Sequence, residues 1–334
     1  MYKRQPYYFF LKQVIFIIIG TFFLFIFTFV IDYWDIKSTG KILMLISIIF
    51  LVLVYIPGIG KEINNAKRWI RIWKFQIQPA EFVKLFWVIY LCDFLDRNRS
   101  RIKRFEVIFG PFLLLIILSS LIYFQPDFGG VVVLNLIFFL MLFIAGYPLK
   151  YILLLLVFPL IFSYFAIAKV EYRMMRLLAF LSPFERPEKG WQIIQSLIAL
   201  GSGGIFGKGM GASTAKLLYI PYAYTDFIFP IFGEEYGFIG CLVLISLYIF
   251  FFIECIKVSF NSTNYFAKLL AMGVSLNIIL HTVLNIGIAS GILPTKGLTL
   301  PFLSSGGSSL ISNMIGVGII LNISIYGKKR INYF

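Results

Sequence analysis

Residues 107–149 read VIFGPFLLLIILSSLIYFQPDFGGVVVLNLIFFLMLFIAGYPL, and Asp127 is the single charged side chain in this stretch. On each side of Asp127 lies an apolar run of about 20 residues, the length that a helix needs to cross the hydrocarbon core of a bilayer. Neither run alternates apolar and polar residues as a barrel strand does. The stretch therefore predicts two successive membrane-spanning helices.

The rest of the chain repeats this pattern. Its 334 residues are 60% hydrophobic, 19% aromatic and 13% charged, with a mean hydropathy of +0.91, which excludes soluble, disulfide-rich and disordered classes. Further uncharged runs cover residues 13–31, 42–60, 151–168, 236–253, 269–295 and 297–327. A ninth segment, 80–95, has the same length but carries Glu81, Lys84 and Asp93. We expect an all-α polytopic membrane protein with about nine transmembrane helices.

The net charge of +15 arises from 30 basic and 15 acidic residues. Most basic residues lie between the apolar runs, so anionic head groups or a phosphorylated lipid are better partners for them than nucleic acid. The three cysteines all fall within apolar segments, which indicates small hydrophobic side chains and not a disulfide or zinc set.

Basic loops predict the orientation of the chain in the membrane. The cluster in residues 96–106 is expected in the cytoplasm, and so is the basic C-terminal tail. Counting crossings from there places residues 58–79, 169–235 and 290–304 outside, provided that the polar, glycine-rich segment 190–204 does not span. The same count places the N-terminus outside, which suggests that a first helix is missing from this sequence.

The predicted external loop 58–79 is itself strongly basic. It carries Lys61, Lys67, Arg68, Arg71 and Lys74 against a single acid. Composition alone also fits an ordinary basic cytoplasmic loop. On the outer face such a loop is an exception to the positive-inside rule, and binding of a diphosphate by Arg and Lys would explain it.

Four ionisable residues are candidates for a functional site. Glu81 and Lys84 are one turn apart and can pair, either as an interfacial ion pair or along a substrate path within the membrane. Asp127 can cap the next helix, act in function, or do both. Asp226 lies between apolar residues in the loop 169–235, where an acid suits a general base or a metal ligand, with a helix cap as the alternative.

Six motifs occur together in one order. They are Ala66-Lys-Arg-Trp-Ile, Gln78-Pro-Ala-Glu-Phe-Val-Lys84, Gln125-Pro-Asp-Phe-Gly, Thr225-Asp-Phe-Ile-Phe, Gly233-Glu-Glu-Tyr-Gly and Pro301-Phe-Leu-Ser-Ser-Gly-Gly-Ser-Ser. From about residue 7 to its end the chain resembles the SEDS family of cell-wall polymerases, typified by FtsW, RodA and SpoVE. Leu293-Pro-Thr-Lys-Gly-Leu-Thr-Leu-Pro is similar to the FtsW and SpoVE branch. The resemblance implies ten helices, of which the first is absent here, and a single membrane domain over residues 1–334.

The resemblance also implies an activity, that of a peptidoglycan glycosyltransferase acting on lipid II. Asp226 matches the essential aspartate of the family's large external loop, while Lys84, Glu81 and Asp127 match positions that line its cavity. We expect Asp226 to act as a base or to hold Mg²⁺ or Mn²⁺. Lys84, Arg68 and Lys67 are expected to bind the diphosphate of the substrate. No organic cofactor is implied.

The partners implied are a class B penicillin-binding protein and other membrane proteins of the division machinery, at the septum of the bacterial cytoplasmic membrane. A lipid II flippase or a non-catalytic scaffold would fit the same family and remains an alternative. The chain departs from the family pattern at Ala80, Tyr222, Tyr224 and Ser305, where the family usually has Ser, Glu, His and Tyr. These departures concern substrate fit near Tyr224, because the nominated charged residues are all present.

Overall fold

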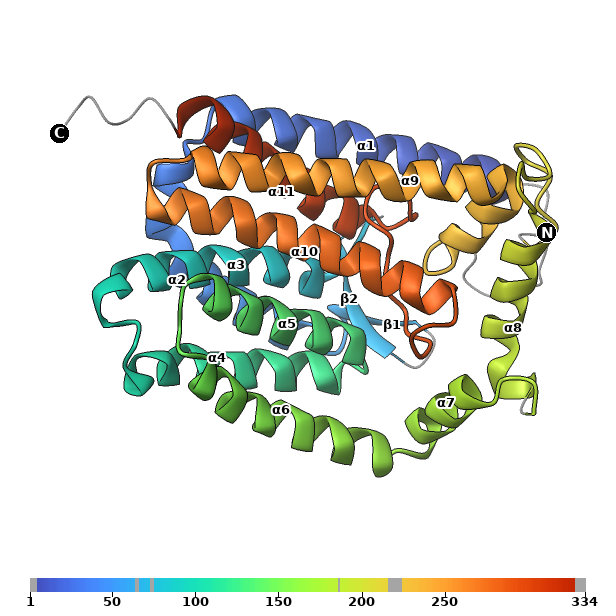
Figure 1. Ribbon diagram of the computed structural model, residues 1–334, viewed down its shortest axis with the longest axis horizontal. Coiled ribbons are helices and arrows are strands. Elements are labelled where there is room, and N and C mark those ends of the chain that lie inside the picture. Colours follow the sequence, from blue (N-terminus) through green and yellow to red (C-terminus); the bar gives the residue numbers. More distant parts are fainter. Residues whose placement is uncertain (1–4, 64–65, 73–74, 186, 216–223, 328–334) are drawn as a thin grey trace. The chain divides into compact units, whose positions relative to one another are not determined.

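Helices occupy each of the nine predicted spans in the computed structural model, which describes residues 5–63, 66–72, 75–185, 187–215 and 224–327 (Figure 1). Contacts divide the chain into two compact units. Unit 1 comprises Met1–Leu154, Ile253–Ile278 and Gly306–Phe334, and unit 2 comprises Leu155–Phe252 and Ile279–Ser305.

Both units are mainly helical. Unit 1 contains α1 (Gln5–Phe29), α2 (Tyr33–Leu53), α3 (Pro79–Arg97), the 3-10 turn Arg99–Arg101, α4 (Phe105–Phe124), α5 (Phe128–Ile144) and α11 (Gly307–Tyr326). Unit 2 contains α7 (Glu171–Leu181) and α8 (Pro187–Ser202), which pack against each other. Parts of α6 (Leu149–Ala168), α9 (Ile228–Asn261) and α10 (Tyr265–Ala289) belong to each unit.

The charged helix α3 lies in the interior of unit 1, where α2, α5 and α11 pack around it. Its Trp87 and Cys92 side chains are completely buried. By contrast α1, which lies alongside α11 (Figure 1), exposes a row of large apolar side chains that suits contact with lipid. Because protein and not hydrocarbon surrounds α3, this helix accommodates Glu81, Lys84 and Asp93 within a membrane domain.

Among the residues that the structure describes, seven helices are long and apolar enough to cross a membrane; the other two predicted spans are α5, with 17 residues, and the charged α3. The span predicted over residues 42–60 was misplaced, because α2 begins at Tyr33. Asp32 caps α2 by accepting from the Trp34 backbone N–H at 2.9 Å. Lys37 pairs with Asp96 at 2.5 Å. The charges of Asp32 and Lys37 are thus compensated, and α2 includes residues that a run of uncharged residues leaves out.

Two other spans have different ends from those predicted. The run 297–327 becomes helical only at Gly307, and residues 297–306 form irregular backbone. The run 236–253 is part of the longer α9, which kinks at Gly237, where the backbone has a φ of 67°. A glycine adopts this left-handed conformation without steric cost.

The basic segment 58–79 folds into a small antiparallel sheet that the sequence analysis did not predict. The strands β1 (Gly60–Ile63), β2 (Ala66–Ile72) and β3 (Phe75–Ile77) lie in the order β1-β2-β3, with β2 in the middle. Ala66 and Ile70 of β2 are buried, whereas Lys67 and Arg71 are exposed. Lys74 lies outside the described residues. The sheet thus gives fixed positions to cations expected on a loop.

Candidate functional site

The first turn of α3 holds a buried ion pair. Pro79 begins the helix, a position that suits proline because its missing N–H would have no partner there. One turn on, Lys84 Nζ lies 2.8 Å from Glu81 Oε1, and the Lys84 side chain is only 2% exposed. An interfacial ion pair would keep its ammonium group in water. The burial of Lys84 therefore argues against an interfacial pair, and a place along a substrate path stays a prediction.

Serines of α11 attach to the same turn of α3. Ser308 Oγ accepts a hydrogen bond from the Gln78 backbone N–H at 2.9 Å, and Ser312 Oγ donates to the Glu81 carbonyl at 3.0 Å. Both serines are buried. Since Ser308 belongs to the motif that starts at Pro301, the structure brings two motifs together that lie more than 200 residues apart in the sequence.

The sheet contacts the turn between α4 and α5 through Arg68. The Arg68 Nε–H donates to the Gln125 carbonyl at 2.9 Å, and its Nη2 donates to the Pro126 carbonyl. Asp127 follows directly and caps α5, since its Oδ1 accepts from the Gly130 N–H at 3.1 Å. The structure thus confirms the capping alternative for Asp127 and gives Arg68 a role in fixing the turn before it. Lys67 is exposed on the same strand.

In unit 2, the backbone around Asp226 is held at three successive carbonyls. The Asp226 carbonyl accepts from Asn285 Nδ2 of α10 at 2.9 Å. The Thr225 carbonyl accepts from Ser304 Oγ at 2.5 Å, and the Tyr224 carbonyl accepts from the Ser305 N–H at 2.9 Å. The partly exposed Asp226 is therefore positioned by residues from α10 and from the irregular segment 297–306.

The carboxylate of Asp226 lies against the backbone of this segment. A Cβ added at Gly297 would come within 2.7 Å of Asp226 Oδ2, closer than two such atoms can approach. The Asp226 segment and the Gly297 segment are both anchored in one apolar cluster. It includes Phe229, three residues after Asp226, and Leu300, three residues after Gly297. Tyr248 belongs to this cluster, and its hydroxyl donates to the Pro301 carbonyl at 2.5 Å.

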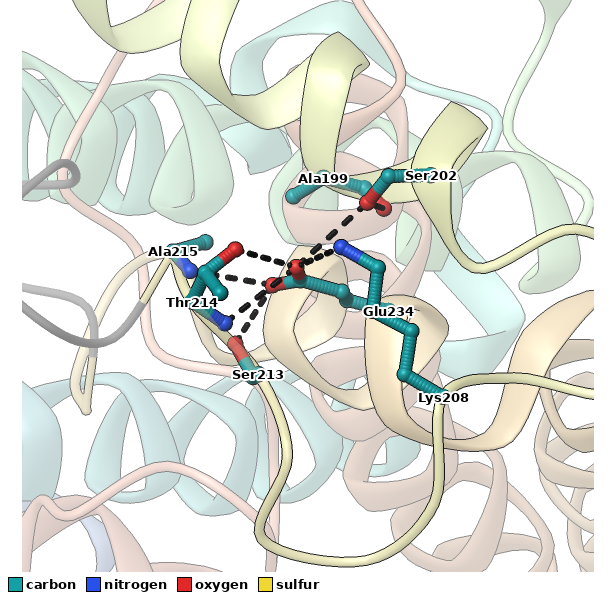
Figure 2. Close-up of polar contacts among 7 residues, drawn as sticks. All are labelled: Ala199, Ser202, Lys208, Ser213, Thr214, Ala215 and Glu234. Carbon is teal, nitrogen blue, oxygen red and sulfur yellow. Dashed lines mark hydrogen bonds and ion pairs between the residues drawn. The ribbon is translucent and has the colours of Figure 1, made fainter.

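A buried acid of α9, Glu234, fastens the loop that contains Lys208 and residues 213–215 (Figure 2). It precedes the kink at Gly237, and its side chain is 1% exposed. Its Oε1 accepts from Lys208 Nζ at 2.6 Å and its Oε2 from Ser213 Oγ at 2.5 Å. Further donors to the carboxylate are Ser202 Oγ, Thr214 N, Thr214 Oγ1 and Ala215 N.

The hydrogen bonds also settle the charge state of Glu234. Burial alone would raise the pKa of this carboxyl group. The hydrogen bonds from Lys208, Ser213, Thr214 and the Ala215 N–H outweigh that effect and hold the pKa well below its ordinary value. Glu234 is therefore a carboxylate at neutral pH, and its charge compensates the ammonium group of Lys208.

Comparison with known proteins assigns the chain to a family. The family model FTSW_RODA_SPOVE, described as "Cell cycle protein", matches residues 1–329. The chain belongs to the FtsW/RodA/SpoVE family. It is 40% identical over 319 residues to a protein of Trichlorobacter lovleyi named "Probable peptidoglycan glycosyltransferase FtsW", covering 95% of this chain and 84% of that one. It is 38% identical over 330 residues to "Stage V sporulation protein E" of Bacillus subtilis, covering 98% and 90%.

Solved structures agree with this assignment. One, described as "Structural coordination of polymerization and crosslinking by a peptidoglycan synthase complex", has a TM-score of 0.82 at 27% identity and covers 97% of this chain and 91% of that chain. The rod shape determining protein RodA of Thermus thermophilus has a TM-score of 0.69 at 27% identity and covers 95% and 87%. The fold is thus that of a multi-pass FtsW/RodA/SpoVE membrane protein.

Two departures from the FtsW/RodA/SpoVE pattern adjoin each other in the structure. Tyr224 replaces the usual His and Ser305 the usual Tyr, and their backbones are joined by the hydrogen bond described above. Compared with the usual pattern, this chain has no tyrosine ring at position 305 but has one at position 224, and the Tyr224 side chain is about half exposed. Tyr222 lies outside the described residues.

Three residues that hold the Asp226 segment and the loop around Lys208 were not predicted from the sequence. Asn285 and Ser304 hold the Asp226 segment, and Glu234 anchors the adjacent loop. A buried Asn within an apolar span was the available signal for the first, because intramembrane polar residues require a partner. The motif around Glu234 was recognised, but the letters of the motif do not say which loop it contacts.

Proposed function

We propose that this protein is a peptidoglycan glycosyltransferase that polymerises lipid II into glycan strands on the outer face of the cytoplasmic membrane and releases undecaprenyl diphosphate. The observation that carries the proposal is the arrangement around Asp226. A carboxylate is held by three successive backbone contacts against Gly297, next to the membrane-spanning part of α9. Family membership and the names of the relatives support the same activity.

In the proposed reaction the 4-hydroxyl oxygen of the acceptor sugar attacks C1 of the donor sugar. As that bond forms, the bond from C1 to the diphosphate oxygen breaks. Asp226 accepts the hydroxyl proton as a general base, and its fixed backbone holds the carboxylate in position. Lys84 stabilises the negative charge that develops on the leaving diphosphate. A buried ammonium group is effective here because it acts in a medium of low dielectric constant.

The other nominated residues have supporting roles. Lys67 is exposed on β2, so its ammonium group is accessible to a phosphate. Arg68 and Asp127 hold the turn that follows α4, so they place this part of the site. Glu81 orients the Lys84 side chain by accepting its hydrogen bond.

A divalent cation fits the donor chemistry near Asp226. Among the described residues, no group of three or more His, Cys, Asp or Glu side chains is close enough to hold a metal alone. Mg²⁺ is commonly held by one or two carboxylates together with substrate phosphates, so Asp226 and a diphosphate would suffice. Bound there, Mg²⁺ or Mn²⁺ would neutralise charge on the diphosphate.

We further propose a class B penicillin-binding protein as the partner that cross-links the strands, at the division septum with other membrane proteins of the division machinery. The solved structure described as a peptidoglycan synthase complex for polymerization and crosslinking supports such an assembly.

The test is polymerisation of lipid II by the purified protein with its partner. Asp226→Asn is expected to abolish glycan strands, while Glu254→Gln, an exposed change on α9, is expected to leave them intact. Full polymerisation by Asp226→Asn would remove Asp226 from the mechanism. Movement of labelled lipid II across vesicles by the native protein, without any polymer, would instead favour a transporter.

A further inference from the structure

In the loop of residues 203–211, here called the glycine loop, the charged side chain is paired with a buried residue and the apolar side chains are exposed. Its sequence GGIFGKGMG contains one charged residue, Lys208, and that side chain turns toward the buried Glu234 (Figure 2). The large apolar side chains of the loop are instead exposed. Ile205 is 62% exposed, Phe206 81% and Met210 84%.

This exposure is not the result of a loosely placed backbone. The Lys208 and Gly209 N–H groups each donate at 3.0 Å to the carbonyls of Glu234 and Glu235. Gly207 has a φ of 83°, and a Cβ at this position would come within 2.2 Å of the Glu235 carbonyl oxygen. The glycine loop is thus packed tightly on the start of α9, and its large apolar side chains project from a fixed base.

The glycine loop is continuous with the lipid-facing surface of α9. The Phe238 N–H donates to the Gly204 carbonyl at 2.9 Å, and the Ile239 N–H donates to the Ile205 carbonyl at 3.2 Å. Phe238 is 66% exposed and opens a series of exposed apolar side chains along this span. In a multi-pass membrane protein such a series contacts lipid, so the loop is bonded to the point where α9 enters the bilayer.

We propose that the glycine loop is a membrane-inserted element, whose Phe206 and Met210 side chains enter the lipid acyl region at this end of α9. Two properties favour lipid as the occupant. The apolar side chains extend a surface that already faces lipid, and the single cation of the loop is paired with Glu234, which removes the main cost of placing it near hydrocarbon. The proposal does not depend on the glycosyltransferase activity.

Nitroxide spin labels at introduced cysteines test the proposal. Phe206→Cys and Met210→Cys are labelled in the purified full chain and reconstituted without partner into vesicles of phosphatidylethanolamine and phosphatidylglycerol. Collision rates with O₂, which concentrates in lipid, are compared with those of a water-soluble nickel chelate. Phe250→Cys, an exposed apolar position within the span, and Lys257→Cys, at the exposed ion pair further along α9, provide the lipid and water references. The unsubstituted chain gives the background from native cysteines.

Labels at 206 and 210 are expected to show a ratio of O₂ to nickel collisions several-fold above that at 257 and close to that at 250. A ratio equal to that at 257 would overturn the proposal. Shielding of both labels from both reagents would also overturn it, because it would indicate contact with protein. In Phe206→Cys the further change Glu234→Gln is expected to lower the ratio, since Lys208 then draws the loop toward water, whereas Glu254→Gln is expected to leave it unchanged. If Glu234→Gln and Glu254→Gln gave the same collision ratio at residue 206, the ion pair of Lys208 with Glu234 would not be what permits insertion.

Discussion

Replacing Glu234 gives a graded prediction, because the two oxygens of its carboxylate have different partners. Oε1 accepts from Lys208, Ser202 and both groups of Thr214, whereas Oε2 accepts from Ser213 Oγ and the Ala215 N–H. The Ser213 and Ala215 donors are themselves buried. In Glu234→Ala both donors lose their acceptor. In Glu234→Gln the amide oxygen can replace Oε1, and the amide NH₂ then faces the Ala215 N–H.

The expected costs follow from these partners. A buried donor left without an acceptor costs about 1–3 kcal/mol. We therefore expect Glu234→Ala to lower the free energy of opening this loop by about 2–4 kcal/mol, because water that enters the space replaces part of the lost hydrogen bonding. Glu234→Gln loses one such bond, about 1–2 kcal/mol. Lys208 also loses its ion pair, but its side chain is about one-third exposed, so its ammonium group reaches water when the loop opens.

Hydrogen exchange of the amides at 208, 209, 214 and 215 measures this opening locally. At 1.4 kcal/mol for each factor of ten, exchange is expected to be about 30- to 1000-fold faster in Glu234→Ala and about 5- to 30-fold faster in Glu234→Gln. The control Glu254→Gln, which removes an exposed pair on the same helix, is expected to change nothing. Equal exchange in native and Glu234→Ala protein would refute the role of Glu234 as the anchor of this loop.

Four further predictions follow from the site. Gly297→Ala places a Cβ against Asp226 Oδ2, so polymerisation should fall more than tenfold while the temperature of thermal unfolding changes little; a normal rate would contradict the contact. Lys84→Met removes the ion-pair partner of the largely buried Glu81 and should lower the unfolding temperature more than Glu81→Gln, which a thermal scan in detergent compares. Arg68→Lys cannot reproduce both carbonyl contacts and should destabilise unit 1 by about 1–2 kcal/mol in denaturant titration. Because the Glu234 pKa is depressed, exchange protection should persist as pH falls from 7 to 5 and weaken only below the ordinary Glu value of about 4.3.

Hydropathy predicted where the helices are, because the need to satisfy backbone groups in hydrocarbon leaves few alternatives. It misplaced α2, because Asp32 caps this helix and Lys37 pairs with the distant Asp96, and a count of uncharged residues does not contain such contacts. It also extended the last span over residues 297–306, since an apolar composition does not distinguish a helix from an irregular segment that packs against Asp226.

For the candidate site, the sequence predicted individual charged residues but not the contacts between distant segments. Charges within spans identified Glu81 and Lys84, and the structure joins them in one ion pair. Asn285 could have been noticed as a polar residue within an apolar span, but its partner and that of Ser304 could not be predicted, because these contacts join segments that are far apart in the sequence. The small sheet that carries Arg68 has strands too short for an alternating pattern to stand out among basic residues.

The most direct test of the account is the side of the membrane that Asp226 faces. A cysteine at Tyr224, two residues away and about half exposed, is reacted in intact spheroplasts with a maleimide that does not cross membranes. Tyr224→Cys is expected to be labelled in intact cells, and Lys257→Cys only after permeabilisation. Labelling of Tyr224→Cys only after permeabilisation would place Asp226 in the cytoplasm, where it could not polymerise lipid II on the outer face.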